Sequence, residues 1–497
     1  IKKISKISDR GKIYDRNGNL LSSNITGHSL FVNAKKVKNK SEISKKLSLI
    51  LNIDKKIIFE KLSLNKEFVY LKRNISPKEH QKIISLGEIN LQTKIKKRRI
   101  YPFQNIVSHM VGFVDIDNQG KSGIEASHNI SLEKGEDVYL TLDINLQNAV
   151  RNELMKTIHN YSAESGTAII MDIESSEILS LYNYPDYDPN NINQSNQNQR
   201  LNRAFQSNYE MGSTFKPLTI ALGIDKNLIK KNMEFDVSKP IKHITDWEPC
   251  KCFLNIKEII VRSSNIGTAR IAEIIGKENQ INFFKKLGFY EPVLIDKIKT
   301  TKPYGQPNHW GKLETMTIGF GHAFAVTPMH LAVAYNSILN KGKKSEPKII
   351  LGNKNKLKNQ TQIITKETSE YISSLLRAVI QESKYTGPRV RIEGYDIGGK
   401  TGTAELTNNG KYDKNLNRTI FVGAFPMSRP KYLILTFIDK PKRKNKNDSI
   451  TSATVNAPLV KNIILRIIEI FNLPQQDDIN ILNAATTINY NSLNAIN

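Results

Sequence analysis

The chain has 497 residues and a mass of 56.4 kDa, more than one ordinary compact core accommodates, so we expect two or three domains. Hydrophobic residues (39%) can fill cores of that size, and 27 glycines with 18 prolines exclude a fibrous or wholly disordered chain. The formal charge of +26 favours an anionic contact, yet the lysines are scattered, without RNA-binding aromatic motifs or zinc-finger spacing. We therefore expect no nucleic-acid partner.

The two cysteines, Cys250 and Cys252, stand one residue apart. They allow at most one local bridge, and a zinc site would need about four ligands where only His243 is near in sequence. We therefore expect no metal site and no cofactor, and the pattern gives these cysteines no role.

Residues 1–140 combine short extended runs with basic polar stretches, including the turn signal Asn17-Gly18 and the lysine-rich segment 94–99. This part of the sequence contains no catalytic constellation. We expect it to form a separate, mixed N-terminal module.

A second domain is predicted over 141–473. Asp143 can cap a helix with apolar residues every four positions, and the runs 167–173 and 177–184 around a polar turn predict an antiparallel hairpin. A polar loop over 185–200 then leads to an apolar helix that starts near Gly212.

The rest of this domain completes an α+β fold. The uncharged stretch 315–340 contains Thr327-Pro328, which predicts a helix ending before Gly342 and too short to cross a bilayer. Runs 419–426 and 432–439 predict adjacent strands, and 459–473 an amphipathic closing helix. Helices therefore bracket an antiparallel sheet, and the polar residues 474–497 predict a loose tail.

Five serines are followed three residues later by a lysine. A serine hydroxyl is a poor nucleophile until a base takes its proton, and this spacing puts both groups on one helix face. The pairs are Ser63/Lys66, Ser131/Lys134, Ser213/Lys216, Ser345/Lys348 and Ser428/Lys431. At least four of these must be accidental if the chain has one active site.

The surrounding motifs single out Ser213. Gly212 precedes it, an apolar helix follows it, Ser263-Ser264-Asn265 comes fifty residues later, and Lys400-Thr401-Gly402-Thr403 stands before the closing strands. These three signatures in this order are the set found in penicillin-binding proteins and serine β-lactamases. Together they are far more specific than any one of them.

A competing motif overlaps the third signature, because residues 394–401 (GYDIGGKT) also satisfy a phosphate-binding P-loop, with Asp439 as its second acidic element. A P-loop must leave an apolar strand and open a helix, whereas charged residues precede this motif and a turn-rich stretch follows it. We therefore expect a strand and hairpin here, and a P-loop ATPase is the weaker alternative.

The strings YEMGSTFKP (209–217), SSN (263–265) and GGKTGTAE (398–405) resemble class B penicillin-binding proteins, and most of all their division-associated D,D-transpeptidase branch. RGKIYDRNGNLL (10–21), YPFQNIVSHMVGFV (101–114) and SGIEASHN (122–129) resemble that family's N-terminal pedestal. The resemblance implies a pedestal or dimerisation-type module over 1–140 and a transpeptidase domain over 141–473. Met211 stands where many relatives have proline, which changes the approach to the nucleophile but removes no reacting group.

The resemblance also implies residue roles. Ser213 is the expected nucleophile, Lys216 its base, Ser263 a proton shuttle, and Asn265 the group that orients the substrate amide and Lys216. Lys400, Thr401, Gly402 and Thr403 are expected to hold the substrate carboxylate, and the backbone N–H groups of Ser213 and Thr403 to form the oxyanion hole.

The resemblance implies that the chain cross-links peptidoglycan stem peptides ending in D-Ala-D-Ala through an acyl-enzyme on Ser213. It also implies that β-lactams are covalent inhibitors and that the reaction serves septal wall synthesis. The same resemblance implies a membrane glycan polymerase and division proteins as partners. It places the bulk of the chain on the periplasmic side of the inner membrane, with an expected membrane anchor before Arg10 that this sequence lacks. A β-lactamase or carboxypeptidase, and a non-catalytic β-lactam sensor or wall-assembly scaffold, are the alternatives.

Overall fold

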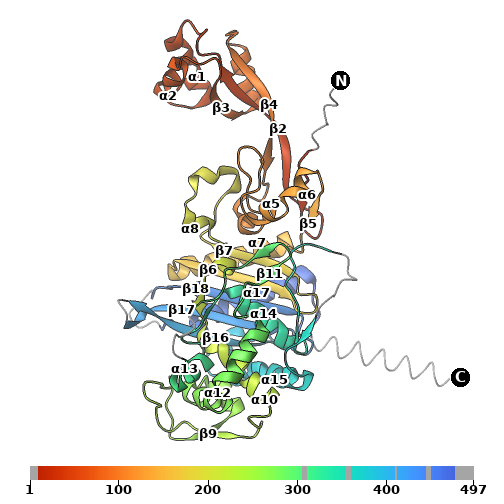
Figure 1. Cartoon of the computed structure of the whole chain (residues 1–497), viewed down its shortest axis with the longest axis vertical. Coiled ribbons are helices and arrows are strands. Elements are labelled where there is room, and N and C mark those ends of the chain that lie inside the picture. Colours follow the sequence, from red (N-terminus) through yellow and green to blue (C-terminus); the bar gives the residue numbers. More distant parts are fainter. Residues whose placement is uncertain (1–8, 305–309, 353–359, 409–410, 444–448, 476–497) are drawn as a thin grey trace, which may run out of the picture.

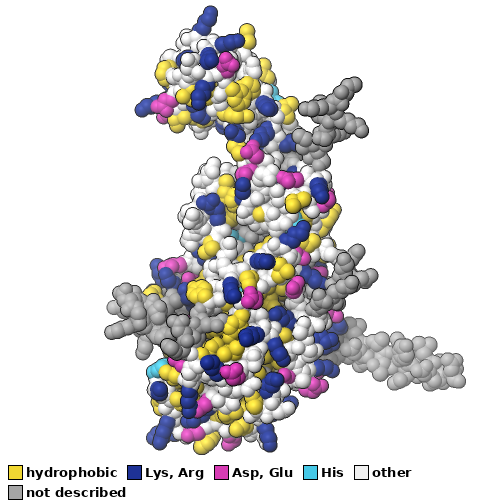
Figure 2. Space-filling view, in the orientation of Figure 1, with side chains coloured by type: hydrophobic (Ala, Val, Ile, Leu, Met, Phe, Trp, Pro, Cys, Tyr) yellow, Lys and Arg dark blue, Asp and Glu magenta, His cyan; other side chains and the backbone are white. Residues whose placement is uncertain are grey.

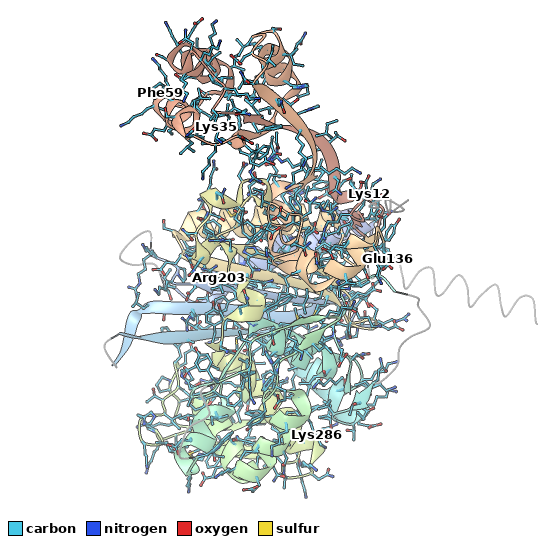
Figure 3. The ribbon with its side chains drawn as sticks, turned by 45° about the horizontal axis from the view of Figure 1, so that its top comes forward. Lys12, Lys35, Phe59, Glu136, Arg203 and Lys286 are labelled. Carbon is cyan, nitrogen blue, oxygen red and sulfur yellow. A yellow bond between two sulfur atoms is a disulfide. The ribbon has the colours of Figure 1, made fainter. Side chains whose placement is uncertain are left out.

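The computed structural model describes residues 9–304, 310–352, 360–408, 411–443 and 449–475. The molecule is elongated, with a small N-terminal module at one end and the large sheet and helices at the other (Figure 1). Nearly all of the predicted loose tail, 474–497, lies outside the described residues. Lys35 and Phe59 lie in the small N-terminal module, which we call the distal module, and Lys286 lies at the opposite end of the molecule (Figure 3).

The distal module has its own hydrophobic core. Two long strands, β2 (Leu20–Val32) and β4 (Leu91–Ile100), pair antiparallel over ten residues, and β3 (Val69–Ile75) joins the other edge of β2. Helices α1 (Lys40–Leu51), α2 (Lys55–Ser63) and α3 (Pro77–Ile84) cover them, around a core that includes Leu30, Leu47 and Leu62. A capping box from Ser76 and Glu79 fixes the start of α3.

A buried ionic cluster ties this module to the rest of the chain. The Glu125 carboxylate accepts from Arg10 and from Arg99, each at 2.7 Å, and from the Ser22 hydroxyl at 3.0 Å. Gly11 packs so closely that a Cβ would lie 1.9 Å from the Glu136 carbonyl oxygen. The short elements at this junction are β1 (Ile13–Tyr14), η1 (Gln104–Val107), α4 (Ser108–Val111), α5 (Gly123–Ser127), α6 (Asn129–Glu133) and β5 (Val138–Tyr139).

A five-stranded antiparallel sheet forms the centre of the large domain. Its strands run in the order β16 (Gly398–Asn408), β17 (Lys411–Phe425), β18 (Tyr432–Asp439), β6 (Ser165–Asp172) and β7 (Ile178–Tyr184). The predicted β6–β7 hairpin and the adjacent β17 and β18 are confirmed. The P-loop alternative is wrong, because Lys400 lies within an antiparallel strand and opens no helix.

Helices cover both faces of this sheet, since β6 and β18 are buried at nearly every position. On one side α7 (Ile144–Tyr161) packs against α17 (Ser452–Phe471), and α14 (Pro328–Leu339) covers the other, with α15 (Lys366–Glu382) beside it. The predicted caps are confirmed: Asp143 accepts from the first turn of α7, and Thr327 from that of α14.

The closing helix begins at Ser452, earlier than the predicted 459, although Pro458 lies inside it. Proline cannot donate to the carbonyl four residues before it. Here the Tyr161 hydroxyl donates to that carbonyl, on Thr454, at 2.9 Å, and the helix therefore continues through the proline.

The predicted polar loop over 185–200 is partly helical, because Asp188 and Asn196 cap short turns within it.

No helix within the described ranges is long and apolar enough to span a bilayer. The remaining elements are η2 (Pro189–Gln194), α8 (Gln197–Arg200), α9 (Arg203–Gln206), β8 (Tyr209–Glu210), η3 (Gly212–Phe215), α10 (Lys216–Asp225), β9 (Glu234–Asp236), β10 (Phe253–Asn255), α11 (Ile256–Arg262), α12 (Asn265–Leu287), β11 (Leu294–Ile295), β12 (Ile298–Lys299), α13 (Lys312–Gly319), β13 (Ala325–Val326), β14 (Lys343–Lys344), β15 (Thr361–Gln362) and α16 (Gly387–Val390).

The excess of positive charge is not gathered in one place. Lys and Arg side chains are spread over the whole visible face, with acidic side chains among them (Figure 2). This distribution gives no continuous basic stripe on that face of the kind that tracks a nucleic-acid backbone.

Candidate active site

Ser213 lies in the 3₁₀ turn η3 that leads directly into helix α10, so that Lys216 follows one turn later on the same face. The turn is held from several sides. The Thr214 hydroxyl donates to the Met211 carbonyl at 2.7 Å, and the Tyr335 hydroxyl donates to the Thr214 carbonyl at 2.7 Å. The nucleophile candidate therefore stands on a fixed segment of backbone.

The second motif is the turn between two helices. Ser263 ends α11 in the left-handed conformation (φ 59°), and Ser264 caps α12 by accepting from the Gly267 N–H. The ammonium or amine nitrogen of Lys216 lies 2.8 Å from Asn265 Oδ1, 3.2 Å from Ser263 Oγ and 2.5 Å from the Ser263 carbonyl oxygen. The tight turn thus directs both motif side chains at Lys216.

Asp246, which the sequence analysis missed, fixes that turn. One carboxylate oxygen accepts from the N–H groups of Asn265 and Ile266 at 2.6 and 2.9 Å, and the other accepts from the Ser264 hydroxyl at 2.6 Å. A carboxylate at a helix N-terminus is favoured by the unsatisfied N–H groups there. Asp246 therefore orients the second motif, and its hydrogen bonds go to that turn and not to Lys216.

The third motif approaches along β16, the edge strand of the sheet. Lys400 Nζ donates to Ser263 Oγ at 2.9 Å and to the Thr401 carbonyl at 3.0 Å. Gly402 is required by close approach, because a Cβ there would lie 2.7 Å from the Met211 carbonyl oxygen. The structure thus joins Lys216, Asn265, Ser263 and Lys400 in one network next to the Ser213 turn.

Lys216 is completely buried, and burial together with the positive charge of Lys400 holds the pKa of its amine well below the ordinary value. A neutral amine has two hydrogens and one lone pair. The Ser263 carbonyl and Asn265 Oδ1 accept hydrogens and cannot donate, since Asn265 uses its Nδ2 to donate to the Thr245 carbonyl at 2.9 Å. The Lys216 lone pair is left to face the Ser263 hydroxyl, 3.2 Å away, as a general base in a proton relay requires.

Lys400 is also buried, and burial lowers the pKa of its amine to about 7. The positive charge of Lys400 helps to lower the pKa of Lys216, whereas burial alone lowers the pKa of Lys400, so Lys400 is the amine that keeps its proton more readily. A bound anionic group next to Lys400 would raise its pKa again and strengthen this division of roles.

The backbone of Thr403 faces the turn that carries Ser213. A Cβ on Gly212 would lie 3.2 Å from the Thr403 carbonyl oxygen, so this carbonyl faces the Ser213 turn and not β17. The N–H and C=O of one residue in an antiparallel strand point to the same side. The Thr403 N–H therefore also points towards η3, the side on which Ser213 lies.

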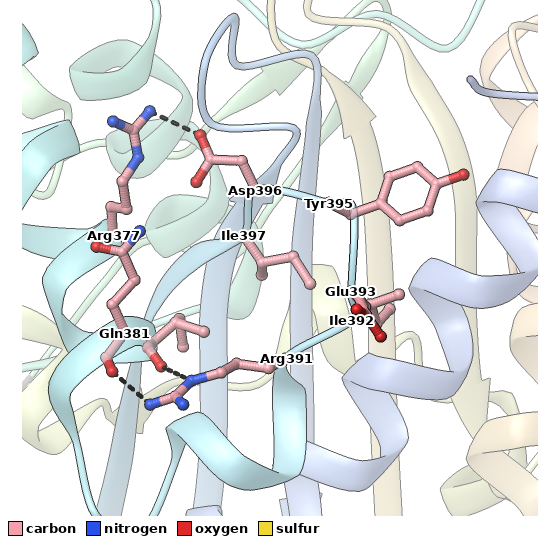
Figure 4. A pocket seen from close by; sticks show the side chains of 9 residues that line it. Arg377, Gln381, Arg391, Ile392, Glu393, Tyr395, Asp396 and Ile397 are labelled. Carbon is pink, nitrogen blue, oxygen red and sulfur yellow. Dashed lines mark hydrogen bonds and ion pairs between the residues drawn. The ribbon is translucent and has the colours of Figure 1, made fainter. Parts of the chain in front are cut away.

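A separate cavity of about 560 Å³ lies at the start of β16 (Figure 4). Its charged groups serve the fold: Arg377 pairs with Asp396 at 2.7 Å, and Arg391 donates to the Ile380 carbonyl of α15 at 2.9 Å. The Tyr395 hydroxyl donates to the Leu473 carbonyl at 2.9 Å. The residues lining this cavity include no serine, cysteine, histidine or lysine, and we do not place the chemistry there.

Cys250 and Cys252 form a disulfide with each other. It lies in the segment between β9 and β10 that also contains Asp246. Within the described residues, no group of three or more His, Cys, Asp and Glu side chains is arranged to hold a metal ion.

Known families match almost the whole chain. The penicillin-binding protein transpeptidase domain matches residues 166–464, and the penicillin-binding protein dimerisation domain matches residues 5–170. The first match contains all three motifs, and it alone covers more than half of the sequence. The chain is a class B penicillin-binding protein of the division-associated branch.

Individual relatives agree with this assignment. The "Probable peptidoglycan D,D-transpeptidase FtsI" of Caulobacter vibrioides is 30% identical over 480 residues, covering 92% of this chain and 80% of the relative. The peptidoglycan D,D-transpeptidase FtsI of Buchnera aphidicola subsp. Baizongia pistaciae is 28% identical over 512 residues, covering 94% and 88%. A peptidoglycan synthetase structure from Bifidobacterium adolescentis, at 20% identity and a TM-score of 0.73 over 94% of this chain and 96% of the other, shares the fold.

Proposed function

We propose that this penicillin-binding protein is a serine D,D-transpeptidase that cross-links peptidoglycan stem peptides through an acyl-enzyme on Ser213. The observation that carries the proposal is the buried Lys216 amine, whose two hydrogens have carbonyl acceptors while its remaining contact, at 3.2 Å, is the Ser263 hydroxyl. The family of this protein and the names of its relatives support the same reaction class.

In the acylation step, Ser213 Oγ attacks the carbonyl of the penultimate D-Ala. Lys216 takes the hydroxyl proton, and the proton passes through Ser263 to the nitrogen of the leaving D-Ala, because Ser263 Oγ lies 3.2 Å from Lys216 Nζ and 2.9 Å from Lys400 Nζ. The backbone N–H groups of Ser213 and Thr403 stabilise the oxyanion; loss of one such donor costs roughly 3 to 4 kcal/mol in comparable sites.

The substrate's terminal carboxylate binds at β16. Lys400 supplies the positive charge, and the hydroxyls of Thr401 and Thr403 with the flat backbone at Gly402 shape the groove. The amine of a second stem peptide then attacks the ester, which forms the cross-link and frees Ser213. A β-lactam enters the first step in the same way and leaves a stable acyl-enzyme.

Cross-linking of wall peptides occurs outside the cytoplasm, and we propose that the bulk of the chain lies in the periplasm at the inner membrane, working with a glycan polymerase and division proteins at the septum. We propose a boundary near residue 140 between the pedestal-type module and the transpeptidase domain. Its support is the capped helix α7, which starts at Ile144 and packs on the sheet.

Cross-linking of stem peptides in vitro tests this function. Purified protein is incubated with a D-Ala-D-Ala stem peptide and a second peptide carrying a free amine, and products are separated by mass. We expect a dimeric peptide with loss of one D-Ala, and none from Ser213→Ala. A protein that binds penicillin yet forms neither cross-linked nor hydrolysed peptide would instead be the sensor or scaffold of the alternative interpretation.

A further inference from the structure

The first turn of helix α17 contacts the edge strand β16 at the residue that follows Gly402. The backbone N–H of Ser452, the first residue of the helix, donates to the Thr403 hydroxyl oxygen at 3.1 Å. The Ser452 hydroxyl donates to the Ile420 carbonyl of β17 at 2.5 Å, and Ser452 itself is buried. One residue therefore ties the helix to both strands beside Thr403.

The capping box of α17 fixes the direction of this N–H. The Thr451 hydroxyl oxygen accepts from the Thr454 N–H at 3.3 Å, and the Thr454 hydroxyl oxygen accepts from the Thr451 N–H at 3.0 Å. The first N–H groups of a helix have no partner within it and need one outside. For Ser452 that partner is Thr403, a side chain of the proposed substrate groove.

The bond with Ser452 limits what the Thr403 hydroxyl can do next. A threonine hydroxyl has one hydrogen and two lone pairs. One lone pair accepts from Ser452, and the hydrogen has no acceptor among the residues that the structure describes. Thr403 is partly exposed and lies two residues from Thr401, on the same face of β16. Its hydroxyl hydrogen is therefore left to donate to a ligand in the groove.

We propose that Ser452 is a positioning residue for recognition of the substrate's terminal carboxylate. Its N–H holds the Thr403 hydroxyl oxygen, so that the hydroxyl hydrogen is directed at the carboxylate and away from α17. The Ser452 hydroxyl, through its bond to Ile420, keeps the start of the helix in place against the two strands. The inference rests on the proposed function, which puts that carboxylate at β16.

The test compares acylation by benzylpenicillin with acylation by its methyl ester, which lacks the negative charge. The measured quantity is the ratio of the two acylation rate constants, obtained from the mass of the intact protein over time. A lactic acid residue is introduced in place of Ser452 and compared with Ser452→Ala, because both have a methyl side chain and only the lactic acid lacks the N–H. We expect the ratio to be about threefold to tenfold lower in the lactic acid variant, the usual contribution of one hydrogen bond.

Two further variants separate positioning from stability. In a Thr403→Val background, the lactic acid replacement should leave the ratio unchanged, because the acceptor of the N–H is gone. Ser373→Ala removes a serine hydroxyl on α15 that bonds within its own helix, and it should keep the parental ratio. A purely structural role of Ser452 would slow acylation by both compounds equally and leave the ratio as it is.

An unchanged ratio in the lactic acid variant would overturn the inference, as would a fall of the same size in the Thr403→Val background. If the lactic acid variant does not fold, Ser452→Pro is judged by the same ratio, since proline also lacks the N–H and is favoured at the first position of a helix. Failure of benzylpenicillin to label Ser213 in the parent would instead remove the proposed function itself.

Discussion

Two buried clusters of basic side chains in this penicillin-binding protein differ in whether a carboxylate contacts the basic groups. At the N-terminal junction, Arg10 and Arg99 share the Glu125 carboxylate, with side chains 4%, 1% and 0% exposed. At the active site, the amines of Lys216 and Lys400 are equally buried, but their hydrogen-bond partners are hydroxyl, carbonyl and amide oxygens.

The difference separates a structural cluster from a reactive one. A buried cation with a carboxylate in contact stays charged and joins segments of the fold. A buried amine without one loses its proton and becomes a base. The nearby carboxylate of Asp246 raises the pKa of Lys216, but burial and Lys400 outweigh it. Its own hydrogen bonds go to Ser264, Asn265 and Ile266 and not to either amine. Each of the following changes tests one side of this comparison.

Lys216→Ala should have the largest effect. Removal of the base should slow penicillin acylation of Ser213 by about a hundredfold to ten-thousandfold, roughly 3 to 5 kcal/mol. The rate is measured by stopped-flow or timed gel labelling. Lys134→Ala, which alters the exposed lysine of another serine–lysine pair, is the matched control and should label at the parental rate. Equal rates in the two variants would remove Lys216 from the base role.

Glu125→Gln should destabilise the junction. It leaves two buried guanidinium groups without a balancing charge, and breaking such a cluster costs about 3 to 5 kcal/mol. The first unfolding transition in urea reports this loss. Glu67→Gln breaks the exposed pair with Lys35, 75% and 46% exposed, and should change stability by less than about 1 kcal/mol. If the two variants unfold at the same urea concentration, the junction cluster has no structural role.

Lys400→Met should change how stability depends on pH. The unfolded chain binds a proton on Lys400 below its ordinary pKa of 10.5, whereas the folded protein has lost most of it above about 7. The buried amine therefore costs the parent stability at pH 7, and this cost disappears as the pH rises to 10.5. The variant's advantage should shrink by on the order of 3 kcal/mol across this range. Lys134→Met should show a constant difference; a constant difference for Lys400→Met would contradict the lowered pKa.

Asp246→Asn should have the smallest effect of these changes. The amide keeps one oxygen for the N–H groups of Asn265 and Ile266 but loses the charge at the start of α12, about 1 to 2 kcal/mol. Acylation should slow about tenfold as the second motif loosens. Asp236→Asn, in the adjacent hairpin, should acylate at the parental rate. No difference between these variants would show that Asp246 does not position the motif.

The sequence predicted those parts of the fold that depend on local patterns. Asp143 and Thr327 predict helices because a capping side chain acts within one turn. The two apolar runs on either side of the polar turn at residues 174–177 predict a hairpin because that turn is also local. The start of α17 could not be predicted, since the Thr454 carbonyl, to which Pro458 cannot donate, accepts instead from Tyr161, which is distant in sequence. The charged junction at Glu125 joins three separate segments and leaves no spacing signal.

The site follows the same division. The motifs at Ser213, Ser263 and Lys400 could be found because each is a short run of residues whose types and spacing indicate a catalytic role. Asp246 could not, since its contact with Ser264 depends on how the β9–β10 segment folds back on α12.

The central claim is that the neutral Lys216 amine activates the Ser213 hydroxyl. Mass spectrometry of the intact protein after reaction with benzylpenicillin, followed by peptide mapping, tests it most directly. We expect one penicilloyl adduct, located on Ser213, complete in the parent, slow to appear in Lys216→Ala and absent in Ser213→Ala. An adduct on another residue, or one that persists in Ser213→Ala, would contradict the account.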